Sequence, residues 1–262
     1  MKHPITKKSL VGLLSAALIA AFTAVIPSTA NATEGCTDQS VIVGKKNVGF
    51  EKCTGVDGIG SKYEIRMPKN FNGMLFLYSH GLRNEVTIPV LPVLNETGKP
   101  ITANREPEVG PNETVNETLL SQGYALAGVG GRINGWAVPE VVESNLHLIV
   151  MAQEMYPKIN KVISWGDSLG GHISQSLSEK YGIIDATANI HMAGSAPAQY
   201  AFGGDILWLL RTYFDPTIKG GNYSPGAAGV AESYADLGKV FTVMGKLQAA
   251  LATGAWPDTS SA

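Results

Sequence analysis

Residues 162–173 read VISWGDSLGGHI, and this stretch decides the fold of the 262-residue chain. A short apolar run leads into the pattern Gly-x-Ser-x-Gly at 166–170, and a helical pattern follows it. A nucleophilic serine needs such a sharp turn between a strand and a helix, because small neighbours let the backbone approach closely and expose the serine oxygen. The pattern therefore predicts Ser168 as a catalytic nucleophile, with Gly166 and Gly170 supplying the room around it.

A structural glycine-rich turn is the alternative interpretation of the same pentapeptide. The pattern by itself is weak, because a chain of this length with 30 glycines produces it by chance about one time in five. The context favours the nucleophile, since residues 162–165 have the apolar character of a strand and residues 169–173 begin a helix.

A second motif, SHGL at residues 79–82, follows the continuously apolar run 74–78. Such a run is typical of a central strand covered by helices on both faces. The position of the motif predicts a turn at His80 and Gly81 whose backbone helps to build an oxyanion hole. An ordinary turn at the end of a strand, with His80 as a packing residue, is the alternative.

The backbone amides near these two turns would supply the hydrogen bonds that acyl transfer requires. We expect the amide of Leu82, or of its neighbour Arg83, to donate to the carbonyl oxygen that becomes negative. The amide of Leu169, directly after the serine, is expected to supply the second donor.

Together these motifs make the chain similar to the α/β-hydrolase superfamily from about residue 63 to residue 198. The resemblance rests on SHGL at 79–82, GYA at 123–125 and GDSLGG at 166–171. It implies hydrolysis of an ester or a related acyl compound. It also implies a catalytic serine that is followed in the chain by an acidic residue and then by a histidine, the last two on loops after later strands.

The last part of the chain does not contain the histidine that this order requires. The five histidines are His3, His80, His147, His172 and His191. His191 is the one late candidate for a relocated base, although a packed histidine at a strand end is the favoured interpretation. The candidate acids after the serine do not end a recognisable apolar strand: Asp205, Asp215, Asp236 and Asp258. We therefore expect that the chain stops before the strands that carry the acid and the base, which would leave Ser168 without activation.

Strands and helices alternate along the chain, which predicts an α/β fold with a mainly parallel central sheet that is flanked by helices and lacks its last strands. The expected strands are 61–67, 74–78, 124–129, 162–165 and 187–192, and the expected helices are 116–122, 139–156, 169–181, 206–214 and 227–251. Residues 83–111 carry five prolines and predict a long surface excursion. We expect a single domain at 33–262, of which 199–262 forms a helical lid or cap.

Residues 1–32 predict an export signal. Three lysines precede an uncharged apolar stretch that Pro27 ends, and Ala30 and Ala32 have the small side chains that a signal peptidase accepts, so we expect cleavage before Thr33. An uncleaved membrane anchor is the alternative. Cleavage removes three of the 20 basic residues and none of the 22 acidic ones, and the resulting net charge of −5 gives no electrostatic footprint for nucleic acid. No second long apolar run follows, so we expect a secreted or extracytoplasmic chain without stable membrane insertion after cleavage.

Cys36 and Cys53 are the two cysteines, and in an exported protein they pair most simply as one disulfide. A closed loop of this size would stabilise the fold by about 3 kcal/mol and would tie down an N-terminal hairpin or loop. A metal site would need further ligands nearby, so the sequence predicts neither a metal nor an organic cofactor.

The sequence as a whole predicts an exported serine hydrolase that acts on a small-molecule carboxylic ester through an acyl-enzyme at Ser168. Two alternatives stay open. One is a peptidase of the prolyl-oligopeptidase-like branch, which shares the same serine turn. The other is a catalytically inactive binding module on the same fold, which the missing late histidine supports. The sequence leaves the oligomeric state open.

Overall fold

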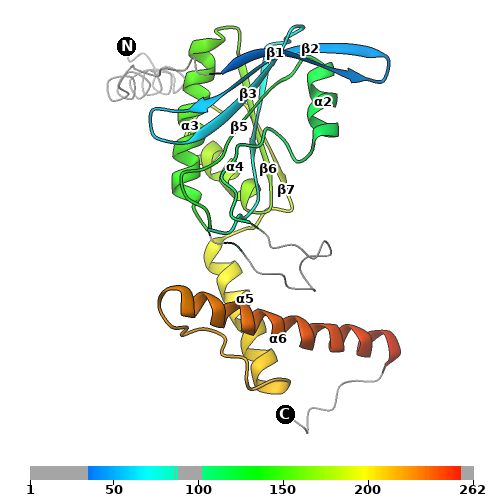
Figure 1. Cartoon of the computed structure of the whole chain (residues 1–262), viewed down its shortest axis with the longest axis vertical. Helices are drawn as coiled ribbons and strands as arrows, with labels where there is room; N and C mark the ends of the chain where they lie inside the picture. The colour runs from blue at the N-terminus through cyan, green and yellow to red at the C-terminus, as the bar shows by residue number, and fades with distance from the viewer. Residues whose placement is uncertain (1–34, 86, 88–101, 255–262) are drawn as a thin grey trace, which may run out of the picture. The chain divides into compact units, whose positions relative to one another are not determined.

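The structure is a computed structural model that describes residues 35–85, 87 and 102–254 (Figure 1). The predicted export signal at 1–32 lies outside the described residues. The chain divides into two compact units, of which the first comprises residues 1–83 and 105–192 and the second comprises residues 84–104 and 193–262. The prediction of a single domain at 33–262 stays a prediction.

The first unit is built on a sheet of seven described strands in the order β1-β2-β3-β5-β4-β6-β7 (Figure 1). The strands are β1 (Cys36–Val43), β2 (Lys46–Val56), β3 (Lys62–Pro68), β4 (Met74–Ser79), β5 (Ala125–Val129), β6 (Lys161–Asp167) and β7 (Ala186–Ile190). The pairings β1/β2, β2/β3 and β3/β5 are antiparallel, whereas β4/β5, β4/β6 and β6/β7 are parallel. The predicted α/β class with a helix-flanked central sheet is confirmed, and the sheet is mixed, because the N-terminal strands join it by antiparallel pairing.

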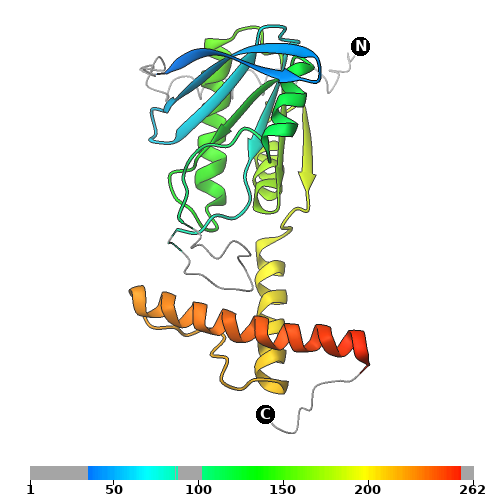
Figure 2. The ribbon, with the colours of Figure 1, turned by 45° about the vertical axis from the view of Figure 1, so that its right-hand side comes forward.

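Three helices cover the two faces of this sheet, as Figure 1 and Figure 2 show: α2 (Glu113–Ser121), α3 (Val138–Met155) and α4 (Leu169–Lys180). Alternate residues of β4 point to opposite faces. Leu75 and Leu77 are fully buried in the core formed with α3 and α4, whereas Phe76 packs against the cluster that contains Leu120 of α2. The apolar run at 74–78 is therefore a central strand covered on both faces, as its composition predicted.

The direction in which successive strands are added to the sheet reverses at β4. The chain passes from β4 to β5 on one side, then crosses over through α3 to β6 on the other side. Ligands of open α/β sheets bind outside the carboxyl ends of strands at such a reversal. In register, Ser79 at the end of β4 lies opposite Gly166 of β6. The two sequence motifs thus end neighbouring strands at the same edge of the sheet.

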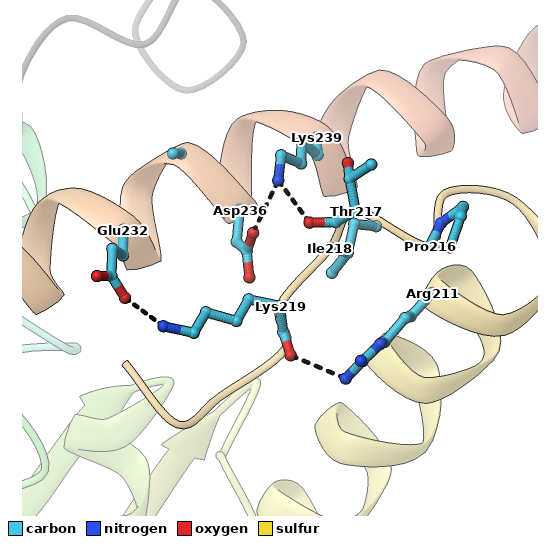
Figure 3. Close-up of a pocket in the computed structure, with 9 residues that line it drawn as sticks. Arg211, Pro216, Thr217, Ile218, Lys219, Glu232, Asp236 and Lys239 are labelled. Atoms are coloured by element: carbon cyan, nitrogen blue, oxygen red, sulfur yellow. Dashed lines mark hydrogen bonds and ion pairs between the residues drawn. The ribbon is translucent and has the colours of Figure 1, made fainter. Parts of the chain in front are cut away.

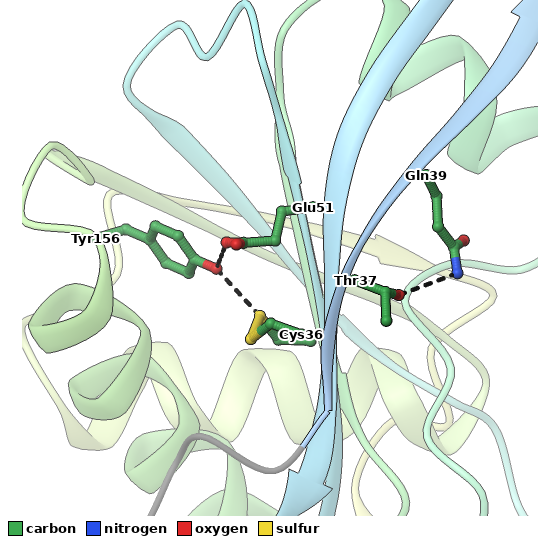
Figure 4. The surroundings of a disulfide bond; sticks show 6 residues. Cys36, Thr37, Gln39, Glu51 and Tyr156 are labelled. Atoms are coloured by element: carbon green, nitrogen blue, oxygen red, sulfur yellow. Dashed lines mark hydrogen bonds between the residues drawn. A yellow bond between two sulfur atoms is a disulfide. The ribbon is translucent and has the colours of Figure 1, made fainter.

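The N-terminal hairpin carries the predicted disulfide. Cys36 and Cys53 face each other in the register of β1 and β2 and are bonded. Tyr156, at the end of α3, donates to a carboxylate oxygen of Glu51 and lies 3.2 Å from Cys53 Sγ (Figure 4). The two sulfurs and a Glu51 oxygen form a group within 4.8 Å, but both sulfurs are used by the disulfide. The hairpin is therefore fixed both to itself and to the helix layer.

The second unit contains α5 (Ala196–Tyr213) and α6 (Gly226–Thr253), which share a cluster of buried side chains around Leu210 and Val240. The prediction that the first of these helices begins at residue 206 is wrong, because α5 continues through Gly203 and Gly204. Glycine lowers helix stability without forbidding the helical conformation, and a proline in the first turn suits a helix start. No described helix has the length and apolar character that a membrane-spanning segment needs.

The predicted surface excursion is only partly described. Residues 83–85, 87 and 102–111 form neither helix nor strand. The returning segment lies close to the end of β5, since a Cβ atom on Gly128 would lie 1.8 Å from the carbonyl oxygen of Glu108. Asn112 then caps α2 by accepting from the amide of Val115, and the helix begins three residues before the predicted position.

Candidate active site

Ser168 lies on a strained turn between β6 and α4. Its backbone has φ 51° and ψ −119°, which is uncommon for a residue with a side chain, and its side chain is exposed. Its amide donates to the carbonyl oxygen of Ile190, at the end of β7, over 2.9 Å. A strained, exposed serine at the carboxyl edge of a parallel sheet has the geometry of a nucleophile turn.

Close backbone packing explains the two glycines of the pentapeptide. A Cβ atom on Gly170 would lie 1.9 Å from the carbonyl oxygen of Ser79, and one on Gly166 would lie 2.4 Å from the same oxygen. Both distances are too short for any side chain. The turn that carries Ser168 is therefore pressed directly against the end of β4.

The His80 turn lies beside the serine. A Cβ atom on Gly81 would lie 3.6 Å from Ser168 Cβ. His80 is buried, and its Nδ1 lies 2.7 Å from the carbonyl oxygen of Gly81, so Nδ1 carries the proton and donates. Because a peptide group is planar, holding the Gly81 carbonyl also fixes the direction of the Leu82 amide, which points the opposite way.

The two predicted amide donors occupy different surroundings. Leu169 is buried and is the first residue of α4, where the N–H groups of a helix have no partner within it and carry a partial positive charge. Leu82 follows the His80 turn with an exposed side chain. Of the two turns, Gly81 lies beside Ser168, and the His80 carbonyl lies beside Gly170.

A buried polar contact that was not predicted from the sequence supports the end of β4. Asn145 of α3 is fully buried and donates from Nδ2 to Ser79 Oγ over 2.8 Å. Its position could have been found from helical periodicity, because it falls on the same side as Val141, Val142 and Leu148. Asn145 therefore anchors the strand end against which the serine turn is packed.

Tyr78 is a second residue that the sequence analysis missed. Its hydroxyl donates to Asp167 Oδ1 over 2.6 Å, directly before the serine. Burial and this contact with the carboxylate raise the pKa of Tyr78 above its usual value, so the phenol stays protonated and acts as a donor. Nearby, Arg83 forms an ion pair of 2.6 Å with Glu108.

The described histidines other than His80 lie in three separate places. His147 Nδ1 is 3.3 Å from Asp57 Oδ2, beyond the end of β2. His172, on α4, packs its ring near Trp136. His191 follows β7 and is exposed with φ 47°, so the interpretation of a packed histidine is wrong there. Its positive φ ends the extended conformation of β7, whose own residues are exposed or partly exposed.

The Ser168 hydroxyl has no hydrogen bond to a histidine within residues 35–85, 87 and 102–254. His3 lies outside this part of the chain. The geometry thus brings together the predicted nucleophile and the predicted oxyanion turn, without a bonded base among the described side chains.

The second unit has its own pocket of about 370 Å³ between α5 and α6 (Figure 3). Its charged side chains are engaged with one another: Lys219 pairs with Glu232, and Lys239 pairs with Asp236. Asp236 is buried and also accepts from the amide of Gly220. Asp215 accepts from Thr217, and Asp205 is exposed on α5, whereas Asp258 lies outside the described residues. Asp215 and Asp236 thus stabilise the segment between the two helices, and none of the three described aspartates ends a strand.

Comparison with known proteins gives distant matches. No family model matches the chain. The chain is 24% identical over 159 residues to an o-phthalyl amidase of Xanthobacter agilis, and the match covers 60% of this chain and 28% of the amidase.

Two solved structures are similar in part. Feruloyl esterase B from Aspergillus oryzae matches 72% of this chain and 39% of its own, at 14% identity and a TM-score of 0.45. An acylaminoacyl peptidase from Pyrococcus horikoshii matches 68% and 26%, at 11% identity and a TM-score of 0.43. The chain thus spans well under half the length of each of these three proteins. The assignment of an α/β-hydrolase type of fold rests on this chain's own strand order and on the succession of β6, the serine turn and α4.

We predict that Gly170→Ala lowers the free energy of unfolding by about 1–3 kcal/mol, because the new methyl group collides with the Ser79 carbonyl. Gly182→Ala is the matched control, since no atom lies within 4 Å of a Cβ there and its φ is not positive. Denaturant unfolding of both variants measures the difference. Equal midpoints for the two variants would show that the backbones are not in contact.

The buried His80 predicts a loss of stability in mild acid. Burial and the positive charge of Arg83 lower the pKa of His80 below its ordinary 6.5 in the folded state. The unfolded chain therefore binds the proton more readily, and stability falls as the pH drops from 6.5 through the lower folded pKa. We expect His80→Asn to lose less stability than the unsubstituted chain between about pH 7.5 and about pH 5.

Thermal melting at the two pH values measures this effect. His172→Asn is the control, because its ring packs beside Trp136 instead of in the His80 turn. If the melting temperature of His80→Asn falls with pH as much as that of His172→Asn, His80 is not the group responsible.

Proposed function

We propose that the chain is a serine hydrolase that transfers an acyl group from a carboxylic ester to water through Ser168. The observation that carries the proposal is the exposed serine on a strained turn, packed by Gly166 and Gly170 against the strand that ends in the His80 turn. Such strain persists only where the surrounding structure enforces it, and it is concentrated at functional sites.

The proposed reaction begins with attack of Ser168 Oγ on the acyl carbon. The ester carbonyl oxygen becomes negative and accepts hydrogen bonds from the amides of Leu82 and Leu169. Collapse of this intermediate breaks the ester C–O bond, releases the alcohol with a proton and leaves an acyl-enzyme. Water then attacks the acyl-enzyme, which releases the acid and restores the serine hydroxyl.

The serine proton must pass to a base, and there are two candidates. His191 is the described histidine next in the chain to Ile190, whose carbonyl accepts from the Ser168 amide, and it is exposed. The other candidate is a residue outside the described part of the chain. A positioned general base accelerates such a step about 10²- to 10⁴-fold. Substitution of the true base should therefore lower the reaction rate by a factor of this size, and substitution of another residue should not.

Amide hydrolysis is a second candidate activity, because the curated relative is named as an amidase. Peptide hydrolysis belongs to the same candidate activity, because a peptide bond is an amide and serine turns of this kind serve both ester and amide substrates. A catalytically inactive binding module is favoured by one observation, namely that no described histidine is bonded to Ser168. Hydrolysis of short acyl esters, of aminoacyl amides or of neither would distinguish the three functions.

Export and a lid complete the proposal. The Cys36–Cys53 disulfide is compatible with an oxidising, extracytoplasmic compartment, where the predicted export signal would deliver the chain. We assign residues 199–262 to a lid or cap because α5 exposes large apolar side chains, including Tyr200, Phe202 and Trp208.

We predict that a fluorophosphonate attaches to Ser168 at least about 100-fold faster than to any other serine, because the elbow exposes its oxygen beside amide donors. Intact-mass analysis and peptide mapping measure the adduct. Ser168→Ala should abolish it, and Ser178→Ala, a half-exposed serine of α4, should keep it.

His191→Asn then separates the two bases. A loss of about 10²-fold or more in labelling rate identifies His191 as the base, and an unchanged rate identifies a group elsewhere. Absence of any Ser168 adduct would contradict the proposed nucleophile and would favour the binding module.

A further inference from the structure

We propose that Tyr78 and Asp167 form a clamp that fixes the Ser168 turn to strand β4, and that both are positioning residues for the nucleophile. The consequence for catalysis rests on the proposed function. The clamp itself rests on a contact between two side chains that are 89 positions apart in the sequence.

The contact is short, and the residue that donates is buried. Tyr78 is only 3% exposed, and its ring packs edge-on against Trp165, its register partner on β6, with centroids 5.1 Å apart. This packing leaves the phenol few alternative directions. The hydroxyl reaches Asp167 Oδ1 over 2.6 Å, and hydrogen bonds to a carboxylate are stronger than those between neutral groups.

The clamp acts on the residue directly before the nucleophile. Asp167 is the last residue of β6, and its second oxygen, Oδ2, lies 3.4 Å from the Cβ position of Gly81. The carboxylate therefore lies between the tyrosine of β4 and the turn that carries the predicted oxyanion donors. Tyr78 thus bonds to the residue before the serine, and the carboxylate of that residue also lies beside the His80 turn.

The strained Ser168 backbone is held from two sides. On the β7 side, its amide donates to the Ile190 carbonyl over 2.9 Å. On the β4 side, Asp167 is bonded to Tyr78. Since a strained conformation relaxes unless its neighbours prevent it, loss of the second contact should let the serine hydroxyl sample directions away from the amides.

The test is a double-mutant cycle in the full chain with fluorophosphonate as the probe. Tyr78→Phe removes one oxygen atom, Asp167→Ala removes the acceptor, and Asp167→Asn keeps an acceptor oxygen. We expect Tyr78→Phe and Asp167→Ala each to lower the maximal labelling rate about tenfold with unchanged reagent affinity. The double variant should also be about tenfold slower, and Asp167→Asn should stay within about twofold of the unsubstituted chain.

Amide hydrogen exchange at Ser168 and Leu169 provides a measurement that needs no reactive serine. Exchange at these two amides should become about tenfold faster in Tyr78→Phe and in Asp167→Ala but not in Asp167→Asn, while amides of the β1–β2 hairpin stay unchanged. A general loss of stability would accelerate both regions together.

The outcomes are distinguishable. Unchanged exchange and labelling in Tyr78→Phe, or a double variant about a hundredfold slower, would overturn the clamp and leave the nucleophile intact. If the unsubstituted chain takes no label, the proposed function fails, and the exchange data alone then support the clamp or overturn it.

Discussion

The contact between the Ser79 carbonyl and the two glycines of the serine turn is the constraint on which the rest of the structure depends. Cβ atoms at Gly166 and Gly170 would lie 2.4 Å and 1.9 Å from that oxygen, so only glycine lets the end of β4 meet the start of α4. The register of β4 and β6 sets this distance, because Ser79 lies opposite Gly166. Once the two strand ends are in contact, the serine and the His80 turn become neighbours.

Several buried polar groups maintain that contact. Asn145 reaches across from α3 to Ser79, and His80 bonds to the carbonyl of its own turn. Tyr78 extends from the same strand to the carboxylate beside the serine. Each of these bonds ends at or next to the last residues of β4. The proposed chemistry thus depends on one strand end, which carries the oxyanion turn on one side and supports the nucleophile on the other.

The sequence was most informative where structure depends on neighbouring residues. The apolar run at 162–165, the glycine spacing and the following helix are local signals, and they predicted the serine turn. The antiparallel pairing of the first strands makes the sheet mixed. It depends on contacts between separate strands, which the alternation of strands and helices along the sequence did not reveal. The Tyr78–Asp167 bond joins positions 89 apart and was missed for the same reason. The early start of α5 was missed because the apolar run begins only at Ile206, after Gly203 and Gly204. Asn145, in contrast, lay within reach of helical periodicity.

The most direct test of the account is a crystal structure of the chain after reaction with a fluorophosphonate. The account predicts one adduct, on Ser168, with its phosphoryl oxygen about 2.7–3.1 Å from the amide nitrogens of Leu82 and Leu169. An adduct on another residue, or a phosphoryl oxygen that faces away from both amides, would contradict it.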